Sequence, residues 1–316
     1  MTSFRGFTFN ISIWLCTVLF ITVPNQVKSH SSTRHNHGMH GTHGTSPCTT
    51  TEATNSNNNQ SVPQEQKVNV NGVNINYLRV GSGEHVVLLL PGAMGTIWMN
   101  YRPQIEGLSK EKFTIIAWDP PGYGKSRPPD RTFPLNFFHR DAAWARDLMK
   151  TIGYERFSLV GWSDGGITAM IMAAKYPENI RKLIIVAANS YISPREMEEY
   201  ESVRNIDTWP NEPRQPLVDY YGEEYFRKTW ASWVDGFKNI YEKRDGNLCK
   251  ELLPDIRCPT LIVQGSNDEG VPPEHPVYLR DHIAGAKMRI IDNGVHPVQL
   301  QFPELFNSIV TNFLTE

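Results

Sequence analysis

From residue 67 onward, the sequence predicts an α/β protein with a mostly parallel sheet flanked by helices. Three observations predict it: a hairpin signal opens the segment, short apolar runs follow at intervals, and helical stretches alternate with those runs. Parallel strands need crossover connections, which are usually helices. Residues 67–316, a stretch of 250 residues, therefore have a length suited to one large domain.

The predicted strands begin with residues 67–71 and 73–80, which alternate apolar and polar side chains around Asn71-Gly72. Strands buried on both faces are continuous apolar runs, and six such runs follow. They are residues 86–90, 113–118, 157–160, 183–188, 260–263 and 288–291.

Helical patterns occupy residues 137–151, 167–175, 274–283 and 303–314. The alternation breaks between residues 188 and 258, a stretch rich in Trp and Tyr that is too long for a loop. It predicts a helical insertion, at about residues 190–250, that caps the carboxyl edge of the sheet. His275 and His282 are predicted on a solvated helix.

The candidate nucleophile is Ser163, in the pentapeptide Gly161-Trp162-Ser163-Asp164-Gly165. This G-x-S-x-G pattern lies between a predicted strand and a predicted helix, where a strained turn pushes the serine outward and small neighbours let the backbone pack closely. The alternative, a Gly/Ser turn without chemistry, would not require that position.

A nucleophilic serine needs a base, and the base needs an orienting acid. Asp268 and His296 both follow predicted strands, in the order serine, acid, histidine that the α/β-hydrolase fold uses. Glu269 is the rival acid, but Asp268 leads into Val271-Pro272. The predicted catalytic residues are Ser163, Asp268 and His296, with no metal and no cofactor.

The oxyanion hole needs two backbone amides, and the sequence predicts those of Asp164 and Ala93. Ala93 lies in the loop Pro91-Gly92-Ala93-Met94-Gly95, where Met94 is a close alternative and a candidate substrate-binding residue. An ordinary strand-end turn would also suit Pro-Gly.

Asp164 directly follows the nucleophile, where a carboxylate would oppose the negative charge that develops on the substrate. An acid at a helix N-terminus is favourable by roughly 0.3–1 kcal/mol, which is one explanation. The other is that a substrate cation neutralises it. An α-ammonium lies close to an aminoacyl carbonyl and is largely protonated at neutral pH, so Asp164 is a predicted substrate-binding residue.

Several segments together resemble the biphenyl hydrolase-like (valacyclovir hydrolase) family over residues 67–316. These segments are LLLPGAMG, AWDPPGYGKSRPPDR, GWSDGGITA, AAKYP and GSNDEGVP. The resemblance implies an α/β-hydrolase fold with a helical cap and a serine esterase acting on α-amino-acid esters, including ester prodrugs. Pro297 departs from the family, which commonly has Asn after the histidine. The alternatives are a carbon–carbon bond hydrolase, a general carboxylesterase and an inactive binding protein of the same fold.

The first 66 residues differ in composition from the rest. Residues 1–29 have a basic start, an apolar core and small residues at the end, which predicts a signal peptide and a secreted or secretory-lumen protein. A mitochondrial transit peptide and an uncleaved membrane anchor remain alternatives. Residues 30–66 are rich in Ser, Thr, Asn and His and predict a disordered linker, with metal binding by its histidines as the less favoured interpretation.

Composition excludes some classes of partner. With 31 basic and 33 acidic residues and a net charge of −2, the chain lacks the positive charge that nucleic-acid binding requires. The expected partner is a small ester substrate bound by a monomer, with membrane contact only if the leader is uncleaved. Cys249 and Cys258 are near enough in sequence to form a disulfide.

Overall fold

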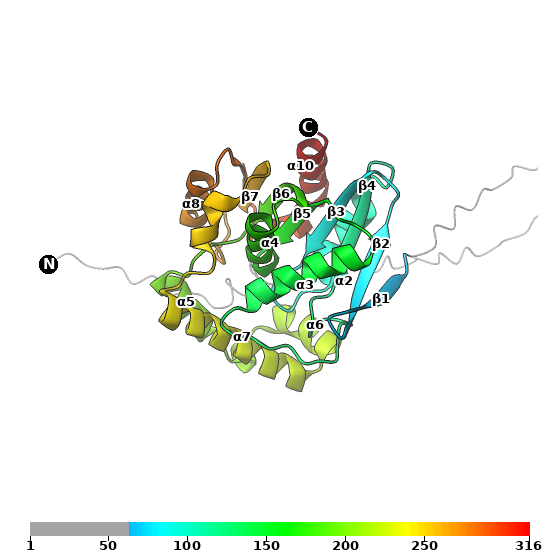
Figure 1. Ribbon diagram of the computed structural model, residues 1–316. Coiled ribbons are helices and arrows are strands. Elements are labelled where there is room, and N and C mark those ends of the chain that lie inside the picture. Colours follow the sequence, from blue (N-terminus) through cyan, green and yellow to red (C-terminus); the bar gives the residue numbers. More distant parts are fainter. Residues whose placement is uncertain (1–62) are drawn as a thin grey trace, which may run out of the picture. The chain divides into compact units, whose positions relative to one another are not determined.

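The computed structural model describes residues 63–316, so the predicted leader, most of the linker and Cys48 lie outside the described residues. One eight-stranded sheet, in the order β1-β2-β4-β3-β5-β6-β7-β8, organises them (Figure 1). Strands β1 (Glu65–Val70) and β2 (Val73–Val80) form the predicted hairpin, and β2 also pairs antiparallel with β4. All the other pairs are parallel, which confirms the predicted class.

The six parallel strands agree closely with the apolar runs of the sequence. They are β3 (His85–Leu90), β4 (Phe113–Trp118), β5 (Phe157–Trp162), β6 (Ile180–Val186), β7 (Thr260–Gly265) and β8 (Lys287–Ile291). Strand β6 begins three residues earlier than predicted and ends before Ala187, whose φ of 46° leaves the strand conformation. Strand β1 likewise starts before residue 67, because the Glu65 carboxylate accepts hydrogen bonds from Trp98 and Asn76.

Helices cover both faces of the sheet. Helices α3 (Phe137–Thr151), α4 (Asp164–Lys175) and α8 (Glu274–His282) contribute to the hydrophobic core on one face. Helices α2 (Ile97–Gly107) and α10 (Pro303–Thr315) contribute to the core on the other, and the short α9 (Val298–Gln301) packs beside them.

Helix α2 is absent from the sequence prediction, because Pro103 lies in its interior, where proline usually breaks a helix. Tertiary contacts hold its start, since the Ile97 amide donates to Asp119 Oδ1 at 2.9 Å. Ile97, Tyr101 and Ile105 are buried at intervals of four residues, a signal that could have revealed the helix.

The segment after β6 forms the predicted helical cap. Its helices are α5 (Pro194–Ser202), η1 (Ile206–Thr208), α6 (Asn211–Tyr221), α7 (Glu223–Arg244) and η2 (Lys250–Asp255). Figure 1 shows α5, α6 and α7 gathered below the sheet in that view. Within residues 63–316, no helix is long and apolar enough to cross a membrane.

A buried pair of residues that the sequence did not indicate joins the cap to the part of the domain that contains the sheet. His282 is exposed as predicted, but the prediction for His275 was wrong: its side chain is fully buried and its Nε2 lies 2.9 Å from Glu196 Oε2. Glu196 belongs to α5, where it also completes the capping box of Ser193. Cys249 and Cys258 are both free thiols.

Replacement of His275 tests this joint. His275→Ala removes one of the three hydrogen-bond partners of the buried Glu196 side chain and leaves a cavity at a fully buried site, so we expect the free energy of unfolding to fall by about 3 kcal/mol. Urea denaturation measures it. The control is His282→Ala on the same helix, which is exposed and should cost no more than about 0.5 kcal/mol; equal losses for both variants would contradict the assignment.

Candidate active site

Ser163 occupies the sharp turn between β5 and α4. Its φ of 54° and ψ of −123° lie outside the regions that L-residues favour. Glycines permit the turn: a Cβ on Gly161 would come within 2.3 Å of the Gly165 carbonyl oxygen, and one on Gly165 would come within 2.0 Å of the Leu90 carbonyl oxygen. The G-x-S-x-G spacing therefore reflects three backbone segments in close contact.

Asp268 and His296 meet beyond the ends of β7 and β8. His296 Nδ1 lies 3.1 and 3.0 Å from the two carboxylate oxygens of Asp268. The Gly270 and Val271 amides and the Gln264 side chain also donate hydrogen bonds to that carboxylate. The rival acid Glu269 is exposed, so the structure brings Asp268 to the histidine.

The histidine is also held from its other side. The indole Nε1 of Trp162 donates to the His296 carbonyl oxygen at 3.0 Å, and the two rings lie 5.2 Å apart. Trp162 is the residue before the nucleophile, so the same turn that carries Ser163 positions the loop of His296. Pro297 follows the histidine and precedes α9.

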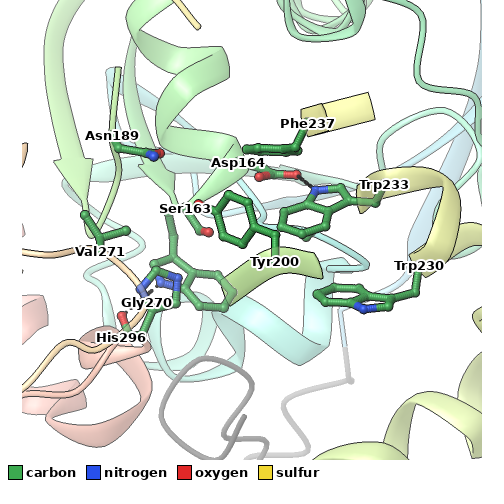
Figure 2. Close-up of a pocket in the computed structure, with 12 residues that line it drawn as sticks. Ser163, Asp164, Asn189, Tyr200, Trp230, Trp233, Phe237, Gly270, Val271 and His296 are labelled. Carbon is green, nitrogen blue, oxygen red and sulfur yellow. Dashed lines mark hydrogen bonds between the residues drawn. The ribbon is translucent and has the colours of Figure 1, made fainter. Parts of the chain in front are cut away.

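A pocket of about 490 Å³, including its opening, joins Ser163 and His296 to the cap (Figure 2). Strand-end residues form its base, and aromatic side chains of α5 and α7 form the opposite wall. The lining residues are Ala93, Trp162, Ser163, Asp164, Asn189, Tyr200, Trp230, Trp233, Phe237, Gly270, Val271 and His296.

The loop after β3 brings Ala93, but not Met94, to this pocket. Met94 is fully buried and absent from the lining, whereas Ala93 is partly exposed there. The Gly92 amide donates to Asn100 Oδ1 and the Gly95 amide to the Gly92 carbonyl oxygen. Ala93 lies between these two glycines in the chain and lines the same pocket as Ser163.

Asp164 is buried at the first turn of α4, with 8% of its surface exposed. Trp233 of α7 donates from its indole Nε1 to Asp164 Oδ2 at 2.8 Å (Figure 2). Burial raises the pKa of Asp164 to about 7, while the Trp233 hydrogen bond and the Arg131 charge oppose that rise. Arg131 is itself paired with the buried Asp141, so its charge is shared between the two carboxyl groups.

The sequence analysis predicted the cap but did not identify which of its residues line the pocket. Tyr200, Trp233 and Phe237 are typical core residues by type, and only the cap fold turns them toward Ser163 (Figure 2). Asn189 lines the pocket just after β6 and donates to the Tyr191 carbonyl and to Glu196 Oε1. Its position beyond a parallel strand was the available signal. Among residues 63–316, no group of His, Cys, Asp and Glu side chains could hold a metal ion.

Comparisons with known proteins agree with this geometry. Residues 85–199 and 187–303 match the family model of the α/β hydrolase fold. Serine hydrolase BPHL of mouse is 48% identical over 248 residues, which cover 78% of this chain and 85% of the mouse protein; the human protein is 46% identical with the same coverage. A solved meta-cleavage product hydrolase from Pseudomonas fluorescens matches with a TM-score of 0.65 and 21% identity, over 79% of this chain and 97% of that one, which shows the shared fold.

The protein is therefore a serine hydrolase of the α/β-hydrolase class. Within that class, the chain belongs to the family of serine hydrolase BPHL, the biphenyl hydrolase-like group that its sequence motifs resemble.

Exchange of the acid distinguishes the two candidate carboxylates. Asp268→Asn should lower kcat by about 10³–10⁴-fold, because the amide no longer selects the histidine tautomer that accepts the serine proton. Glu269→Gln should keep kcat within about twofold, since exposed substitutions rarely disturb a site. Initial rates on a 4-nitrophenyl ester measure both; the opposite ranking would assign the acid to Glu269.

Proposed function

We propose that the protein hydrolyses carboxylic esters of α-amino acids through an acyl-enzyme intermediate. The observation that carries the proposal is the buried Asp164 carboxyl beside the nucleophile. A simple ester offers this group nothing, whereas an aminoacyl ester brings an ammonium one carbon from the reacting carbonyl.

The proposed reaction begins with Ser163. Its Oγ attacks the ester carbonyl while His296 takes the hydroxyl proton and Asp268 holds the imidazole. The amides of Ala93 and Asp164 donate to the oxyanion. His296 then protonates the departing alcohol, and a water molecule activated by the same histidine attacks the acyl-enzyme, releasing the amino acid and restoring Ser163.

Two features of the pocket suit an ammonium. A bound cation would favour the ionised form of Asp164, whose pKa burial raises to about 7. Trp230, Trp233 and Phe237 present aromatic rings in the same pocket, and such rings attract cations. A charge-assisted bond from the ammonium to Asp164 would also orient the carbonyl toward Ser163.

Two matched substrates isolate the ammonium. The 4-nitrophenyl esters of valine and of isovaleric acid differ only in the amino group. Asp164→Asn should lower kcat/KM for the valyl ester by roughly 10–100-fold, the value of a hydrogen bond to a charged group. The isovaleryl ester should change by no more than about threefold; equal losses on both esters would remove the role proposed for Asp164.

The pH dependence provides an independent test. Because the pKa of Asp164 is about 7, its ionised fraction falls from about one half at pH 7 to about one tenth at pH 6. The ratio of kcat/KM for the valyl ester to that for the isovaleryl ester should therefore fall roughly fivefold over this interval. An effect of pH that is common to both substrates cancels in the ratio.

In Asp164→Asn, the same ratio should change little between pH 6 and pH 7, where the substrate ammonium is largely protonated. A ratio that falls equally in the wild type and in the variant would assign the pH dependence to another group.

A further inference from the structure

A tyrosine of the cap is hydrogen-bonded to the loop that carries Ala93. Tyr221, the last residue of α6, donates from its hydroxyl to the Met94 carbonyl oxygen at 2.9 Å. The same hydroxyl accepts from the Gly124 amide at 3.0 Å. With only 5% of Tyr221 exposed, this hydroxyl is shielded from water and its hydrogen is directed at Met94.

The loop that receives this bond is a tight turn against the nucleophile. The Gly95 amide donates to the Gly92 carbonyl oxygen at 3.1 Å, which closes the turn around Ala93 and Met94. A Cβ on Gly92 would lie 3.2 Å from Ser163 Cβ. Any rotation of this turn therefore moves the Ala93 amide relative to the serine.

The turn of residues 92–95 contains a backbone conformation that is unfavourable for a residue other than glycine. Met94 has a φ of 53°, in the left-handed region that glycine adopts freely and other residues adopt at a cost. A residue in that conformation persists when its surroundings hold it. On the core side, the buried Met94 side chain contributes; on the cap side, Tyr221 holds the carbonyl.

We propose that Tyr221 is a positioning residue for the oxyanion hole: the cap holds the Met94 carbonyl, and with it the tight turn of residues 92–95, so that the Ala93 amide two peptide units earlier points at the developing oxyanion. The proposal rests on the Ala93 amide as an oxyanion donor, but it does not depend on the amino-acid ester substrate. It makes cap docking a requirement for the chemical step as well as for enclosing the pocket.

Tyr225, four residues further along the chain at the start of α7, provides a matched control. Its hydroxyl donates to the Gly122 carbonyl oxygen and accepts from the Arg131 amide, so it also joins the cap to the core. The rings of Tyr221 and Tyr225 are stacked, with centroids 5.9 Å apart. Neither partner of the Tyr225 hydroxyl belongs to the turn of residues 92–95.

The test compares Tyr221→Phe with Tyr225→Phe on the 4-nitrophenyl isovaleryl ester. Tyr221→Phe should lower kcat about tenfold with KM within about twofold, because a misdirected donor weakens the transition state more than the bound substrate. Tyr225→Phe should retain kcat within about twofold. Thermal unfolding of both variants reports how far each substitution loosens the cap.

An alkylboronic acid gives a second measurement. It forms a tetrahedral adduct with the serine that resembles the intermediate, so its Ki should rise in Tyr221→Phe by about the factor by which kcat falls. Purely structural loosening of the cap would alter KM and stability and leave the ratio of Ki to KM unchanged.

Unchanged kcat in folded Tyr221→Phe, or equal losses of kcat in the two variants, would overturn the proposal. If Tyr221→Phe does not fold, 4-aminophenylalanine and 4-fluorophenylalanine at position 221 replace it. The first keeps a donor and should keep kcat, whereas the second keeps the shape but cannot donate and should lose it; equal kcat for these two would also overturn the proposal. Loss of turnover in Ser163→Ala separates a failure of this inference from a failure of the serine mechanism.

Discussion

The close approach of three backbone segments at Ser163 is the constraint on which the rest of the site depends. Gly161 and Gly165 let the end of β5 and the start of α4 approach each other and the end of β3. That approach forces Ser163 into its positive φ and places its side chain at the carboxyl edge of the sheet. It also brings the Asp164 amide and the Ala93 loop to the same place, because each is attached to one of the approaching segments.

The cap completes the site by adding hydrogen-bond donors and aromatic surface. Trp233 donates to Asp164, and Tyr221 donates to Met94. The first contact comes from α7 and reaches the residue after Ser163. The second comes from α6 and reaches the loop that follows β3. The buried contact of Glu196 with His275 joins α5 to the core next to the loop of Asp268. The cap is therefore hydrogen-bonded to the domain at three separate places around the predicted catalytic residues.

Asp164 illustrates how burial changes the chemistry of a residue. At the start of a helix in water, a carboxylate would be ordinary and favourable. In the pocket, burial raises the pKa of Asp164 to about 7, and Arg131, which opposes that rise, is already paired with Asp141. A group in this state favours a cationic partner, which is the physical basis of the proposed preference for aminoacyl esters.

The sequence by itself determined the strands, the strand–helix position of Ser163 and the order of Ser163, Asp268 and His296. Continuous apolar runs and fixed turn spacings are local properties, so they can be recognised in the sequence without knowledge of the fold. Tertiary structure alone decided that α2 forms around Pro103, that His275 is buried against Glu196, and that Trp233 and Tyr221 donate to Asp164 and to Met94. These outcomes depend on pairs of residues from 22 to 127 positions apart along the chain, and no local pattern specifies which buried side chains will meet.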